Sequence, residues 1–219
     1  MNQPSPLEPP RISRAEIGVL AFNLAYLAIA LIASFRLQNR EFLFYFVVMC
    51  VLLAAVAALH LRLRLPIAAL WGLSLWGLAH MAGGLMPIPE SWRRHGETHV
   101  LYNLWLIPQW LKYDQLVHAC GFGLVTWICW LGLQKAFALH GVAIRPTLGL
   151  LTLCVAGGTG FGAANEVVEF IATLTLPSTN VGGYDNTGWD LVSNLVGCLL
   201  AAVVIRLREG RPFPDDRRA

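Results

Sequence analysis

The sequence has 219 residues, of which 56% are hydrophobic and 13% are charged, and its mean hydropathy is +0.57. Soluble domains usually carry about 25% charged residues, so this composition excludes an ordinary soluble domain and indicates an integral membrane protein. The net charge is only +3, and we expect no nucleic-acid partner.

The chain begins with a polar, proline-rich segment, MNQPSPLEPP. This segment lacks the charged region, apolar core and cleavage site of a secretory signal. We therefore expect residues 1–14 to form a cytoplasmic tail, and residues 207–219, which are rich in charge, to form a second one.

Six apolar segments then follow one another along the chain, and each is long enough to cross a bilayer, which takes about 20 residues. Polar or proline-containing breaks separate them, and no internal repeat suggests a duplicated transporter fold. The sequence predicts an all-α fold, a polytopic membrane helical bundle with six transmembrane helices. The expected spans are 15–35, 42–61, 66–86, 114–134, 147–176 and 188–206.

The distribution of Lys and Arg predicts the orientation of these spans. If the N-terminus is inside, the inner segments hold eleven of these residues and the outer loops hold five. We therefore expect both termini to be cytoplasmic, in a multi-pass membrane protein.

The connection at 87–113 is long and rich in Trp and Tyr, as in the stretch HVLYNLWLIPQWL. Aromatic rings with polar tips favour the headgroup layer of a membrane. We expect this connection to lie along the outer interface, mainly as an anchor, and it could also form the rim of a substrate site.

Ionisable and amide side chains gather at matching ends of four predicted spans. Successive spans run in opposite directions, so the end of the third, the start of the fourth, the end of the fifth and the start of the sixth share one side. With the expected orientation, that side is periplasmic. The side chains are His80, Asp114, His118, Glu166, Glu169, Asp190 and Asn194.

Their spacing favours convergence as well. Residues three or four positions apart lie on one face of a helix, and charged residues in membrane helices usually face the bundle interior or a wet cavity. The glycines before Glu166, in AGGTGFGAANE, would allow close helix approach, and Gly121, Gly123 and Gly197 could serve the same packing.

Plainer explanations exist for part of this set. Asp114 and Asp190 begin helices, where a carboxylate is stabilised by the helix dipole, and His80 alone could be an ordinary core histidine. Glu166 and Glu169 are harder to explain, because an acidic residue at the centre of a membrane helix costs about 2.5–3.5 kcal/mol. Two carboxylates so close also repel each other unless they are protonated, paired or bridged.

The set fits two kinds of chemistry. Histidine and carboxylate ligands suit a divalent metal such as Zn, Mn or Fe, with all seven side chains as candidate ligands, and helical bundles carry metal sites of this type. Without a metal, His118 could hold a proton, and a glutamate with a raised pKa could act as a general acid or base. The candidate catalytic residues are Glu166, Glu169, His118 and Asp114.

Three stretches, YDQLVHACGFG, NEVVEF and YDNTGWDLVSNLVG, resemble the YjdF-like family of uncharacterised bacterial inner-membrane proteins. The resemblance rests on Tyr113, Asp114 and His118, on Glu166 and Glu169, and on Trp189 and Asp190. Asn194 departs from the YjdF-like pattern, and an Asn at this position resembles the pattern of the VanZ-like family, which is associated with teicoplanin resistance. Glu169, in turn, departs from the VanZ-like pattern. The resemblance covers about residues 75–200 and implies no particular reaction.

We hypothesise that the chain is a metal-dependent or acid–base membrane enzyme that acts on a lipid-linked or cell-envelope substrate at the outer leaflet. Membrane lipids would surround it as partners. Tyr184 and Asp185, in the loop NVGGYDNTG, would then form a lid. Two alternatives remain open: a proton-coupled small-molecule transporter, in which the carboxylates carry protons, and a structural or assembly subunit, in which the cluster only ties helices together.

Overall fold

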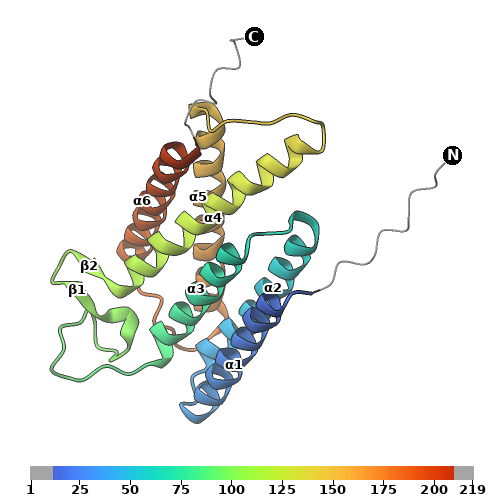
Figure 1. Cartoon of the computed structure of the whole chain (residues 1–219). Coiled ribbons are helices and arrows are strands. Elements are labelled where there is room, and N and C mark those ends of the chain that lie inside the picture. Colours follow the sequence, from blue (N-terminus) through green and yellow to red (C-terminus); the bar gives the residue numbers. More distant parts are fainter. Residues whose placement is uncertain (1–11, 210–219) are drawn as a thin grey trace, which may run out of the picture.

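A computed structural model describes residues 12–209 of the chain, and its main elements are six long α-helices (Figure 1). A 3-10 turn and a two-stranded antiparallel hairpin lie between the third and fourth helices. The helices are α1 (Arg14–Arg36), α2 (Arg40–Leu63), α3 (Ile67–Leu85), α4 (Tyr113–Ala138), α5 (Leu148–Thr175) and α6 (Tyr184–Glu209). Between α3 and α4 lie η1 (Leu101–Asn103), β1 (Trp105–Ile107) and β2 (Leu111–Lys112).

Polar residues cap several helix starts and explain where the helices begin. The side-chain oxygens of Ser13, Asn39 and Thr147 accept hydrogen bonds from the first free amides of α1, α2 and α5. Such caps satisfy amides that have no partner within the helix. At α1 the cap is reciprocal, because Glu16 accepts from the Ser13 amide at 2.6 Å.

Five of the described helices, α1, α2, α4, α5 and α6, are long and apolar enough to cross a membrane. Helix α3 has 19 residues and is the shortest of the six long helices, and it is not among the five. The structure therefore agrees with a membrane helical bundle, while the number of crossings and the side of each terminus stay predictions. Most of the two expected tails lies outside the described residues.

Successive helices run in alternating directions, so the ends of α3 and α5 and the starts of α4 and α6 lie at one end of the bundle (Figure 1). We call this end the hairpin end, because β1 and β2 also lie there. Helix α4 packs against α3, α5 and α6, and α1 packs against α2 and α3. Away from the hairpin end, α4, α5 and α6 share an apolar core, which includes Trp130, Leu151, Cys154, Ala202 and Ile205.

Glycine makes the close approach of α4, α5 and α6 possible. A Cβ at Gly197 would collide with the Ala119 carbonyl, and one at Gly162 would lie 2.6 Å from Asn194 Nδ2. Gly160 has nothing within 4 Å. The predicted packing role therefore falls to particular glycines of the run and not to all of them.

The aromatic connection between α3 and α4 is a folded unit of η1 and the hairpin. Its contacts with α2 and α3 come from Tyr102, whose ring packs against Phe42 and His80, whereas Trp110 is 83% exposed. The contribution of Trp110 to interfacial anchoring stays a prediction.

The prediction of a loop at Tyr184 and Asp185 is wrong, and a lid role for these two residues stays a prediction. Tyr184 and Asp185 form the first turn of α6, which begins four residues before the expected span, and Tyr184 is 91% exposed. The expected loop is shorter because Asn186 donates a hydrogen bond to the Val181 carbonyl, and its side chain also bonds Asp190 one helical turn further on.

Candidate functional site

Three helices bring polar side chains together near the hairpin end. Helix α4 supplies residues from its first two turns, α5 from its last third, and α6 from its second and third turns. We call the following residues the polar cluster: Asp114, His118, Glu166, Glu169, Asp190 and Asn194.

The imidazole of His118 lies at the centre of the polar cluster and is only 3% exposed. Its Nδ1 atom is 3.0 Å from Asn194 Oδ1 and 3.7 Å from Glu166 Oε1. Its Nε2 atom is 3.7 Å from Asp114 Oδ1. A proton on Nδ1 would let the ring donate to this amide oxygen and would leave the Nε2 lone pair facing Asp114.

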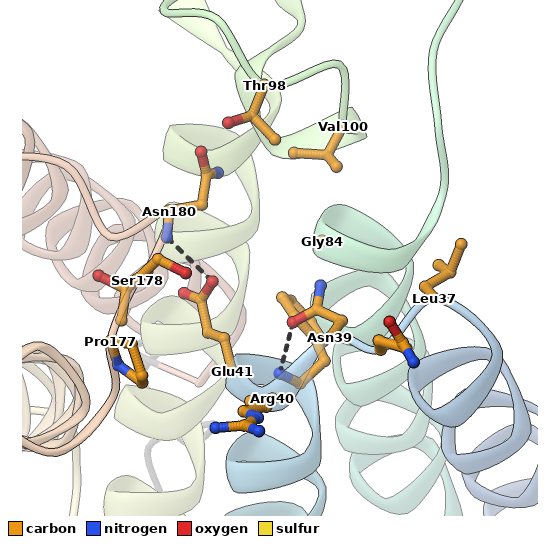
Figure 2. Close-up of a pocket in the computed structure, with 13 residues that line it drawn as sticks. Leu37, Asn39, Arg40, Glu41, Gly84, Thr98, Val100, Pro177, Ser178 and Asn180 are labelled. Atoms are coloured by element: carbon orange, nitrogen blue, oxygen red, sulfur yellow. Dashed lines mark hydrogen bonds between the residues drawn. The ribbon is translucent and has the colours of Figure 1, made fainter.

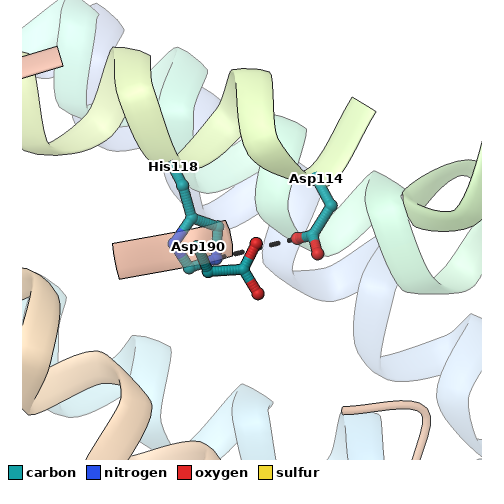
Figure 3. Close-up of side chains that lie close together, drawn as sticks. All are labelled: Asp114, His118 and Asp190. Atoms are coloured by element: carbon teal, nitrogen blue, oxygen red, sulfur yellow. Dashed lines mark ion pairs between the residues drawn. The ribbon is translucent and has the colours of Figure 1, made fainter. Parts of the chain in front are cut away.

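Two groups of potential metal ligands share this imidazole. One consists of Asp114, His118 and Asp190, and the other of His118, Glu166 and Glu169; in each, one ligand atom per residue lies within 4.8 Å of the others. Figure 3 shows the first group, with the carboxylates of Asp114 and Asp190 on the same side of the His118 ring.

Several polar atoms of the polar cluster are buried without a hydrogen-bond partner: both carboxyl oxygens of Glu166, Asp190 Oδ1 and Asn194 Nδ2. The Asp190 and Asn194 side chains are fully buried, and Glu166 is 8% exposed. A buried polar group without a partner usually costs about 1–3 kcal/mol, and more when it is charged. The site therefore has acceptor capacity that a cation or protons could satisfy.

Two residues that sequence reasoning missed, Lys112 and Asn186, contact the polar cluster. Lys112 is 5% exposed, its Nζ lies 3.7 Å from Asp114 Oδ2, and it also bonds the Asn186 side chain. Asn186 donates to Asp190 Oδ2 at 2.5 Å. Lys112 stands two residues before Asp114, and this proximity was the available signal; Lys112 entered the prediction of orientation only as one of the five outer Lys and Arg residues.

The charges of this region do not balance within the chain. Asp114, Glu166, Glu169 and Asp190 would carry four negative charges if all were ionised, and Lys112 supplies one positive charge. Even a protonated His118 leaves an excess of acid. Because buried charges are normally paired or coordinate metals, a divalent cation, protonated carboxyls or both are needed to complete the site.

His80 lies outside both ligand groups. Its Nδ1 is 2.5 Å from the Tyr102 hydroxyl, and its ring packs edge-on against Tyr45 and Tyr102. Burial raises the pKa of the Tyr102 hydroxyl well above its usual value, so this phenol stays neutral. The prediction of His80 as a metal ligand therefore receives no geometric support, although His80 remains near the polar cluster.

A small cavity of about 30 Å³ lies next to the polar cluster. His80 and Tyr102 line it together with Asp114 and Glu169. This volume is enough for one water molecule, and a buried water needs two to four polar partners, which these side chains can provide.

Residues 18–211 match the family model described as "Predicted membrane protein (DUF2238)". The chain belongs to this family. DUF2238 is the family typified by YjdF, which agrees with that part of the resemblance, whereas the VanZ-like part gains no support from the match. Neither a curated protein nor a solved structure matches the chain.

Membership of DUF2238 establishes a membrane protein and agrees with the long apolar helices. The matched range includes every residue of the polar cluster. The description gives no activity, so the function of this DUF2238 member has to be argued from the site.

Proposed function

We propose that this chain is a multi-pass inner-membrane enzyme whose polar cluster binds a divalent cation and uses adjacent carboxyl groups for acid–base chemistry on a lipid-linked or cell-envelope substrate. The observation that carries the proposal is the set of buried carboxyl oxygens without a hydrogen-bond partner, both of Glu166 and one of Asp190, around one imidazole. Charged groups within membrane helices are rare and mostly functional.

The group formed by Asp114, His118 and Asp190 fits a metal best. Asn194 Oδ1 lies 3.0 Å from Nδ1 of the imidazole and can accept a hydrogen bond from it, and metal-bound histidines usually donate their second N–H to such an acceptor. This contact orients the ring so that Nε2 faces Asp114, whose carboxylate oxygen is 3.7 Å away. Two carboxylates and one imidazole are a ligand set that suits Zn²⁺, Mn²⁺ or Fe²⁺.

A metal held there would act as a Lewis acid and lower the pKa of a bound water. The glutamates of α5 would donate and accept protons. Glu166 lies 3.7 Å from the other side of the same imidazole, and Glu169 accepts a hydrogen bond from Asn165 at 2.9 Å and lines the small cavity. A proton held by Glu169 can therefore reach a water in that cavity.

The structure favours this proposal over proton-coupled transport. A transport path needs polar groups across the whole membrane. On the side of the polar cluster away from the hairpin end, however, α4, α5 and α6 pack through Trp130, Leu151 and Cys154. Trp130 is fully buried there. An enzyme with access from one side needs no path through this layer.

Metal content of the purified protein tests the proposal. We expect about one divalent ion per chain by elemental analysis, and loss of that ion in the Asp114→Asn/Asp190→Asn variant. Glu16→Gln is the matched control, because it exchanges a carboxylate for an amide in α1, where Glu16 contacts Ser13 and His60.

Each result has a distinct meaning. Retention of metal by Asp114→Asn/Asp190→Asn together with its loss in Glu166→Gln/Glu169→Gln would move the ion to the second ligand group and refute the assignment made above. The absence of any bound or titratable divalent ion in the unmodified protein would refute the metal-dependent function altogether.

A further inference from the structure

A second, larger cavity opens at the hairpin end of the bundle. Its volume is about 510 Å³, within the range of about 300–1,000 Å³ that is usual for ligand pockets. It lies where the α1–α2 connection, the end of α3, the connection before η1 and the α5–α6 connection meet. Figure 2 shows Asn39, Glu41, Thr98, Ser178 and Asn180 around it.

The lining of this large cavity is polar but close to neutral. Amide and hydroxyl side chains predominate, and they come from Gln38, Asn39, Thr98, Ser178, Thr179 and Asn180. One cation, Arg40, and one anion, Glu41, accompany them. Glu41 is 8% exposed, and one of its oxygens accepts from the backbone N–H of Asn180 at 2.9 Å.

This chemistry selects among ligands. Arg40 is the one cation of the lining, and Glu41, its one carboxylate, already accepts from the backbone N–H of Asn180, so neither a phosphate nor an ammonium group meets a set of free opposite charges there. Side chains that both donate and accept hydrogen bonds suit a group with several hydroxyls, and six such side chains line this cavity. The lining therefore fits a neutral, hydroxyl-rich group such as a sugar ring.

The large cavity lies against the small cavity of the polar cluster. Glu41, Phe42 and Asn180 line both, so these three residues form the wall between them. On the far side of that wall are Asp114 and Glu169. A molecule in the large cavity is therefore only one layer of side chains away from the proposed catalytic carboxylates.

We propose that the large cavity binds the sugar part of the substrate, either as a free saccharide or as the headgroup of a glycolipid. This inference rests on the proposed function for its meaning as a substrate site, but the binding itself needs no metal. Glu41 and Asn180 then separate the bound sugar from the polar cluster and have to move apart for the two to meet.

The test uses the full chain in nanodiscs of phosphatidylethanolamine and phosphatidylglycerol. Saturation-transfer NMR measures binding of free glucose and N-acetylglucosamine, with inositol phosphate and choline as charged probes. Native mass spectrometry of nanodiscs that contain monoglucosyl diacylglycerol measures retention of the glycolipid, which separates the lipid source from the free one.

Thr98→Trp fills the large cavity from an exposed position, and Ser91→Trp adds the same ring to an exposed position of the same connection that does not line it. We expect a sugar probe in one of the two arms to bind the unmodified protein and Ser91→Trp, and to bind Thr98→Trp at least about tenfold more weakly, a loss of about 1.4 kcal/mol. Metal content should be the same in all three.

Two results would overturn the inference: no sugar binding in either arm, or equal binding by the two tryptophan variants. Preference for a charged probe would overturn the assigned ligand class. Because Glu166→Gln/Glu169→Gln should retain sugar binding, failure of the metal proposal and failure of this one can be told apart in the same samples.

Discussion

The contact between α4 and α6 gives the sharpest test of how packing holds the polar cluster together. Replacing Gly197 by Ala would place a carbon 2.8 Å from the Ala119 Cα and still closer to its carbonyl. These are backbone atoms, so no side-chain rotation can relieve the contact and the two helices have to separate. Overpacking usually costs about 1–3 kcal/mol, and alanine recovers up to about 1 kcal/mol in helix propensity.

Gly160→Ala is the matched control, because its added carbon would have nothing within 4 Å and so gains the propensity without the clash. We expect Gly197→Ala to be less stable than Gly160→Ala by roughly 2 kcal/mol, which for a chain of this size corresponds to about 4–8 °C in melting temperature. Thermal unfolding in the same detergent and at the same scan rate measures this difference.

The separation of α4 and α6 in Gly197→Ala should also change the geometry of the polar cluster. His118 precedes Ala119 by one residue, and Asn194 precedes Gly197 by three, so the 3.0 Å contact between the imidazole and the amide lengthens when the helices part. We expect Gly197→Ala to bind divalent metal more weakly than Gly160→Ala. Equal melting temperatures and equal metal affinities of the two variants would refute this account of the packing.

Three further predictions concern residues in and away from the site. Asn194→Leu removes the acceptor for the His118 ring and should weaken metal binding about 10–100-fold; unchanged affinity in calorimetry would mean that the amide does not orient the ring. Lys112→Met removes a positive charge 3.7 Å from Asp114 and should strengthen divalent-ion binding at low salt by at least about tenfold, whereas weaker binding would contradict a cation site at that carboxylate. Glu16→Gln keeps a side-chain oxygen for the α1 capping box but removes the negative charge 2.7 Å from His60; we expect little change in melting temperature and an unchanged metal content, and a fall in metal content would link the two ends of the bundle.

Much of the helical framework follows from local sequence. Runs of about 20 apolar residues are bounded by polar caps such as Asn39 and Thr147, and the helices begin and end within a few residues of the expected spans. The shared level of the α4, α5 and α6 side chains follows from the alternation of helix direction, which sequence order alone fixes. These features depend on residues close together in the chain.

The surroundings of the polar cluster depend on residues far apart in the chain. The Lys112 side chain bonds the Asn186 side chain across 74 positions of the chain, and the Glu41 side chain accepts from the backbone N–H of Asn180 across 139 positions. Tyr102 reaches His80 from a connection whose hairpin was not expected. No local pattern encodes such pairs, because they depend on how the helices and connections pack.

The sequence by itself determined that this protein is helical, membrane-embedded and acidic at one level of its bundle, because hydropathy, capping and helix direction are local properties of the chain. Only the tertiary structure decided which acidic groups face the His118 ring, that His80 turns to Tyr102 instead, and that a polar cavity lies behind Glu41 and Asn180. Those outcomes depend on the close approach of helices and on connections folding over their ends, which is settled by packing in three dimensions.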